Sequence, residues 1–154
     1  MHKGKLSPRH LARSLAVQGL YSFLTNPRTI TEIEEFLQNS NAEIYKKANY
    51  ELFHYLLQQS SDNFTGLLDL YLSYSTRPLA EIQKVEQAIL VIAATELKND
   101  LQVPAPVIIN EAIELAKLYG GEESYKFING LVDKLASKLR NTESSAPRDI
   151  RIDG

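Results

Sequence analysis

The residues best suited to chemistry in this sequence are cations and an aromatic ring near the N-terminus. No Asp or Glu precedes Glu32, whereas five Lys and Arg residues do. Single-stranded RNA is recognised by such a mixture, because cations neutralise phosphates while rings and guanidinium planes stack on bases. A basic terminus that is merely solvated is the alternative that charge alone leaves open. The predicted RNA-binding residues here are Lys3, Lys5, Arg9, His10, Arg13 and Tyr21.

A helix must position these side chains. Ser7 is a typical N-cap and Pro8 suits the first helical position, where a missing N–H costs nothing. Arg9 and Arg13 are four residues apart, so both are expected to project from one side of the helix. Their like charges repel unless an anion relieves them. We therefore expect an anionic ligand on this side of the helix.

Catalytic and metal-binding patterns are weak. The chain has three His and no Cys, and it contains no glycine-rich phosphate loop. Glu111 and Glu114 are three residues apart on one helix face that also carries Lys117, which is typical of a solvated face. We expect no enzymatic activity, no metal and no cofactor.

A second group of residues is interpreted as a partner surface. Tyr71 and Tyr74 flank the loop before a long apolar helix, and we expect both to be exposed. Glu86 lies between apolar residues of that helix, so it is either partly buried, and then paired, or directed at a partner. The predicted partner-binding residues are Tyr71 and Glu86.

Apolar periodicity predicts helices along the whole of residues 1–140 and no strands. Breaks are expected at Asn26-Pro27, at residues 39–41, at the cap cluster of residues 60–62, at the loop of residues 73–78 and near Asn99-Asp100. One uninterrupted helix is expected over residues 42–59, and another from Leu79 to Leu97 with neighbours on several sides. The last break is the glycine cap Gly120-Gly121.

The fold class is therefore all-α, with about seven helices in two three-helix groups that share one core. Residues 1–140 are predicted to form a single helical domain that binds RNA and protein, and residues 141–154 a disordered tail. No signal peptide and no membrane span are predicted. The absence of Cys fits a reducing compartment, so we expect a cytoplasmic protein.

The sequence resembles the NusB family of bacterial transcription antitermination factors. The matching residues run in the same order over most of the chain outside residues 26–59 and the tail. They are Arg9, Arg13, Ala16, Val17, Gln18, Leu20, Tyr21, Ser22, Val85, Glu86, Ala88, Ile89, Leu90, Ile92, Ala93, Glu96, Leu97, Val103, Pro104, residues 109–117, Gly120, Phe127, Asn129, Gly130 and Asp133.

This resemblance implies binding to the boxA element of nascent RNA, as a heterodimer with NusE, a small-subunit ribosomal protein. It also implies action with RNA polymerase and other Nus factors to suppress termination on ribosomal RNA operons, without enzymatic activity. By resemblance the RNA surface extends to Glu123, Lys126 and Phe127, and the partner surface includes Tyr71 and Glu86. The chain departs from the pattern at His10 and Leu11, which interrupt an arginine run, and at Glu123, which replaces a frequent aspartate.

Two other functions are alternatives. One is a helical interaction module that forms a homodimer and binds no RNA. The other is an accessory RNA-binding domain of an RNA methyltransferase, although this chain carries no catalytic part.

Overall fold

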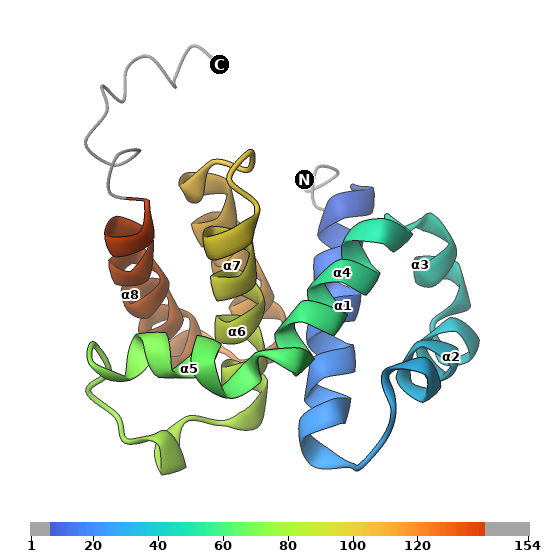
Figure 1. Ribbon diagram of the computed structural model, residues 1–154, viewed down its shortest axis with the longest axis horizontal. Helices are drawn as coiled ribbons and strands as arrows, with labels where there is room; N and C mark the ends of the chain where they lie inside the picture. Colours follow the sequence, from blue (N-terminus) through green and yellow to red (C-terminus); the bar gives the residue numbers. More distant parts are fainter. Residues whose placement is uncertain (1–6, 141–154) are drawn as a thin grey trace.

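The computed structural model describes residues 7–140, and over this range the chain is helical and has no strand (Figure 1). Lys3, Lys5 and the predicted tail of residues 141–154 lie outside the described residues. The all-α prediction is confirmed, with eight α-helices in the described range rather than about seven. They are α1 (Pro8–Thr25), α2 (Ile30–Ser40), α3 (Ala42–Lys47), α4 (Tyr50–Asp62), α5 (Phe64–Leu72), α6 (Lys84–Asn99), α7 (Ala105–Tyr119) and α8 (Glu122–Leu139), with a short 3-10 helix η2 (Leu79–Glu81) before α6.

The additional helix arises because the predicted helix over residues 42–59 is broken in two. Ala48 is extended, with a ψ of 156°, and ends α3. The Asn49 side chain then accepts a hydrogen bond from the N–H of Leu52 at 3.0 Å and begins α4. Asn favours such caps because its side chain competes with the helical backbone. The Asn49 N–H also donates to the Pro8 carbonyl at 2.9 Å, which joins this break to the start of α1.

Two further helix limits differ from the prediction. The apolar stripe from Leu79 begins in η2, and α6 itself begins only at Lys84. The cap cluster of residues 60–62 lies inside α4, where Ser60 is buried and bonds the Thr95 hydroxyl at 2.8 Å. Helix α6 begins at Lys84 because Gln83 and Glu86 form a capping box there, and α4 continues to Asp62 because Asn63 caps its end.

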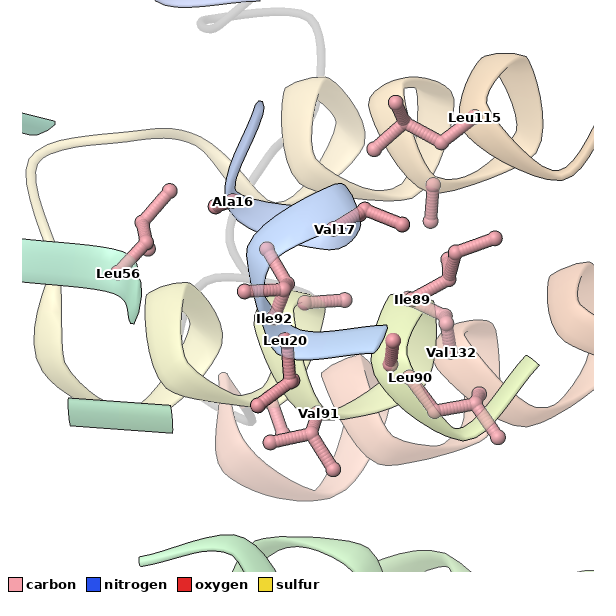
Figure 2. Close-up of a cluster of buried hydrophobic side chains, with 14 of the residues drawn as sticks. Ala16, Val17, Leu20, Leu56, Ile89, Leu90, Val91, Ile92, Leu115 and Val132 are labelled. Atoms are coloured by element: carbon pink, nitrogen blue, oxygen red, sulfur yellow. The ribbon is translucent and has the colours of Figure 1, made fainter. Parts of the chain in front are cut away.

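Helix α6 is buried on every side. Each of its residues from Glu86 to Leu97 is buried, as expected of a helix that packs against several others. It contacts α1, α4, α5, α7 and α8. Side chains from α1, α4, α6, α7 and α8 meet in one cluster around it (Figure 2). The predicted central position of this helix is confirmed.

Two groups of helices share this core. Helices α1 to α4 lie on one side of Figure 1 and α6 to α8 on the other, while α5 packs across α6 and α8. The inner faces of both groups belong to a single cluster of buried apolar side chains. The prediction of two helix groups with one core is confirmed, but the first group has four helices instead of three. No helix of the described chain is long and apolar enough to cross a membrane.

Tyr71 on α5 is part of this core. The expectation that it is exposed is wrong: its relative exposure is 0%, whereas Tyr74 is half-buried. The Tyr71 hydroxyl donates to the Leu90 carbonyl at 2.7 Å, and burial raises the pKa of Tyr71. Tyr71 follows Leu67 and Leu68 at helical spacing, so it shares their face toward α6.

We expect Tyr71→Phe to lower the free energy of unfolding by about 1 kcal/mol, because it removes one buried hydrogen bond and keeps the ring. Urea denaturation followed by circular dichroism measures the change. Tyr74→Phe is the matched control and should leave stability unchanged, since its hydroxyl has no hydrogen-bond partner within the described residues. Equal stability of both variants and the parent chain would contradict the prediction.

Candidate nucleic-acid interface

Arg13 lies inside the protein rather than on its surface. Its residue exposure is 4%, and its guanidinium donates to the Glu96 carboxylate through two hydrogen bonds of 2.7 and 2.8 Å. Glu111 contributes a second carboxylate at 3.7 Å. Burial by itself would lower the pKa of Arg13, but the hydrogen bonds and charge of Glu96, with the charges of Glu111 and Asp100, outweigh it and raise the pKa. Arg13 therefore stays charged and joins α1 to α6 and α7.

The neighbours of Arg13 divide between interior and surface. His10 is buried and its Nδ1 lies 2.9 Å from the Glu111 carboxylate. Arg9 is exposed, with 45% of its side chain accessible, and lies 3.6 Å from Asp100. Arg9 and Arg13 do project from one side of α1, toward Asp100 and Glu96 at the end of α6. Carboxylates of the protein relieve the charge of Arg13, so this pair does not require an anionic ligand. The expected solvation of Glu111 is wrong, because it is half-buried against α1.

The other predicted RNA residue of α1, Tyr21, is on the surface with 44% exposure. It lines an open groove of about 690 Å³ between the second half of α1, α2 and the start of α6. Tyr21 lies twelve residues after Arg9, which is about 18 Å along a helix. The predicted residues of α1 thus occupy opposite ends of the helix.

Glu86 is the centre of a second buried ionic cluster, at the start of α6. Its exposure is 2%, and it accepts hydrogen bonds from Arg77 at 3.0 and 3.2 Å, from the Ser124 hydroxyl at 2.6 Å and from the Gln83 N–H at 3.0 Å. Burial by itself would raise the pKa of Glu86, but these bonds and the charge of Arg77 lower it. The Ser124 contact also requires Gly120, because a Cβ there would lie 2.5 Å from the Cβ of Ser124. Of the two predicted cap glycines, only Gly121 has a positive φ, of 109°.

Arg77 connects this cluster to the surface. Its guanidinium lies over the Phe127 ring, 3.5 Å from the centroid, a cation–π contact. Sequence reasoning missed Arg77. The available signal was Glu86 itself, since a buried carboxylate requires a partner and Arg77 is the single cation between residues 73 and 83.

The predicted residues of α8 surround Arg77. Glu123 and Lys126 are exposed, and with Phe127 they line a cavity of about 610 Å³. Lys126 lies 3.3 Å from Glu122, but both side chains are well solvated and this pair is weak.

Gln83 brings these surfaces together. It lines both the groove that contains Tyr21 and the cavity formed by Glu123, Lys126 and Phe127. The two adjoin at Gln83, just before α6, and together they present rings and cations from α1, from α8 and from the loop before η2. Arg9 lies apart from both, at the beginning of α1. That these residues bind RNA, and that the buried residues His10, Arg13, Tyr71 and Glu86 contribute to binding, stays a prediction. Among residues 7–140 no group of three or more His, Asp or Glu residues is placed to hold a metal ion.

The fold and this surface define a class: a helical domain with one core that presents aromatic rings and cations, a combination typical of proteins that bind single-stranded nucleic acids. The model of the NusB family matches residues 10–137. The chain is 44% identical to the transcription antitermination protein NusB of Aromatoleum aromaticum over 140 residues, which is 91% of this chain and 95% of the relative. It is 41% identical to the NusB protein of Azoarcus sp. (strain BH72) over 91% of this chain and 90% of the relative. The corresponding protein of Pasteurella multocida is 40% identical over 90% of this chain and 94% of the relative. The chain belongs to the NusB family.

We expect Arg13→Ala to lower the free energy of unfolding by roughly 3–5 kcal/mol, because it leaves the Glu96 carboxylate buried without its partner. Arg9→Ala is the matched control, and loss of its exposed charge should change stability by less than about 1 kcal/mol. Replacing both partners with apolar residues, as Arg13→Met with Glu96→Leu, should cost less than Arg13→Ala alone. Urea denaturation measures all three, and a loss for Arg13→Ala no larger than that for Arg9→Ala would refute the role given to this pair.

The lowered pKa of Glu86 predicts a dependence of stability on pH. Since the unfolded chain binds the proton at a higher pH than the folded chain, this group stabilises the fold above the ordinary glutamate pKa. That stabilisation is lost as pH falls through the folded pKa. Glu86→Gln should therefore be destabilised most near neutral pH, and its deficit should shrink as the solution becomes acidic. Denaturation at several pH values tests this, with the exposed Glu81→Gln as control; a deficit that is constant with pH would contradict it.

Proposed function

We propose that this protein is a transcription antitermination factor that binds boxA-containing RNA together with NusE and acts with RNA polymerase and other Nus factors in the cytoplasm. The observation that carries the proposal is the gathering of Tyr21, Lys126 and the Arg77–Phe127 pair around Gln83. Single-stranded RNA is recognised by such exposed rings and cations. The relatives at 40–44% identity are named transcription antitermination proteins, which supports the same proposal.

In this proposal the two buried clusters position the surface instead of touching the RNA. Glu86 holds Arg77 over Phe127, so it presents a charged plane and a ring in a fixed arrangement. Arg13 holds the start of α1 against α6, so that Arg9 extends outward. Arg9 adds a phosphate contact at this end of the helix, and Lys3 and Lys5, which lie outside the described residues, are proposed to add two more. A bound RNA would then contact separate places on α1 and α8.

The proposed surface for NusE lies on α5 and the start of α6. Tyr71 and Glu86 are the predicted residues of this surface, and both are buried. We infer that Tyr71 and Glu86 hold α5 and the start of α6 in place, and that exposed neighbours such as Leu79 contact NusE. Leu79 is 46% exposed and lines a cavity between α5 and η2. In this proposal, joint binding of RNA and NusE by the protein promotes processive transcription of ribosomal RNA operons.

Fluorescence titration of labelled boxA RNA, with and without NusE, tests the function. We expect NusE to increase the affinity of the protein for boxA RNA over that for an RNA of the same composition in scrambled order. Equal affinity for the two RNAs in the presence of NusE would refute the proposal.

We expect Lys126→Ala to weaken RNA binding because it removes one phosphate contact. The slope of log affinity against log salt concentration should fall by about 0.7 in magnitude. Helicity should not change, since Lys126 is exposed. Lys138→Ala, which removes an exposed cation from the other end of α8, is the control. An unchanged salt slope for Lys126→Ala would show that this side chain does not contact the RNA.

A further inference from the structure

The groove beside Tyr21 is large enough to hold a ligand. It has a volume of about 690 Å³, within the range typical of ligand sites, roughly 300–1,000 Å³. Its walls come from α1, the turn after α1, α2 and the start of α6, with Tyr119 from the end of α7. The start of α6 and Tyr119 are far in the sequence from α1 and α2, so the groove exists only in the folded chain.

The inner wall of the groove is held rigidly by hydrogen bonds. The Tyr119 hydroxyl bonds the Ser14 hydroxyl at 2.7 Å and accepts from the Gln18 amide at 2.9 Å. The Gln18 carbonyl in turn accepts from the Asn41 amide at 2.8 Å. This chain of bonds joins α7, α1 and the end of α2 on one wall of the groove.

Two aromatic rings line the groove and remain exposed. Tyr21 is 44% exposed on α1, and Phe36 is 49% exposed on α2. The Arg28 guanidinium lies 5.2 Å from the centre of the Phe36 ring. Exposed rings of this kind provide stacking surfaces for bases of any sequence.

The charge of the groove is positive. Arg28 and Lys84 are among its lining residues, and no carboxylate is. Within the described chain neither cation has a carboxylate at ion-pair distance, whereas Glu32 caps α2 through Thr29 and Glu34 contacts Tyr50 and His54. The two cations are therefore available to an anionic ligand. Stacking rings combined with unpaired cations match a nucleotide better than a neutral or acidic partner surface.

We infer that this groove binds nucleotides that flank boxA, so that the RNA continues from the surface around Gln83 along α1 and α2. Arg28 and Lys84 contact phosphates of these nucleotides and Phe36 stacks on a base, while Tyr21 lies where the groove meets the boxA surface. Gln83 lines both the groove and the cavity around Arg77 and Phe127, so the groove adjoins the proposed boxA surface. The inference rests on the proposed function and extends it from one RNA element to the sequence beside it.

Three RNAs test this in the presence of NusE: boxA alone, and boxA with about four uridines added at either its 5′ or its 3′ end. One of the two extensions should raise the affinity of the protein roughly tenfold through stacking and phosphate contacts. It should also steepen the salt slope by about 1.4, since two phosphates are neutralised at about 0.7 each. The double variant Arg28→Ala/Lys84→Ala should lose both gains and keep its affinity for boxA alone.

Two further variants test the parts of the inference separately. One removes a stacking ring from the groove, and the other removes cations that lie outside it. Phe36→Ala should lose much of the gain in affinity but keep the steeper salt slope. Lys134→Ala/Lys138→Ala removes two exposed cations from α8, outside the groove, and should keep both gains. Circular dichroism verifies that every variant retains its helicity.

Several outcomes would overturn the inference. If boxA alone binds but neither extension adds affinity, the groove does not hold RNA and the proposed function stands. The same conclusion follows if the Arg28/Lys84 double variant keeps the gain. If that variant loses affinity for NusE in the absence of RNA and not for the extended RNA, the groove belongs to a protein partner. If no RNA binds the parent chain, the proposed function fails and this inference fails with it.

Discussion

The burial of α6 is the constraint on which the rest of the structure depends. Each residue from Glu86 to Leu97 is inside the protein, yet this segment contains two carboxylates. An unpaired charge in such a place costs far more than a fold of this size can tolerate. Each carboxylate must therefore find a cation from another part of the chain. Glu96 is paired with Arg13 of α1, and Glu86 with Arg77 of the loop before η2.

These two pairs place the surfaces that the protein presents. They lie ten residues apart on α6, or about 15 Å along the helix. One pair fixes the start of α1 and leaves Arg9 exposed. The other fixes Arg77 against Phe127 and, through Ser124, the start of α8. The same carboxylates that make α6 difficult to bury thus orient cations and rings at its two ends.

Much of the fold could be predicted from local pattern. Periodicity of apolar residues, Ser7-Pro8, Asn26-Pro27 and the glycines near residue 120 located most helices, because helix ends depend on nearby residues. The break at Ala48-Asn49 was missed, since Asn49 is stabilised in part by Pro8, which is distant in sequence. The start of α6 was placed too early because the apolar stripe continues into η2.

Prediction of the site was less complete, because a residue type does not reveal which way its side chain points. Arg9 and Arg13 are both arginines of α1, but only Arg13 is paired with Glu96. Tyr21 and Tyr71 are both tyrosines on amphipathic helices, yet one is 44% exposed and the other is buried against Leu90. The groove of Tyr21, Arg28, Phe36 and Lys84 combines residues 21–36 with the start of α6, and no local pattern predicts that these two parts of the chain lie together.

By itself the sequence determined the helical class, the single core, the family resemblance and the types of residue available for binding. Those properties follow from periodicity, composition and short motifs, which act over a few residues. Only the tertiary structure decided which cations are exposed and which are neutralised inside. The physical reason is that burial of a charge depends on a partner brought close by folding, and that partner lies 83 residues away for Arg13.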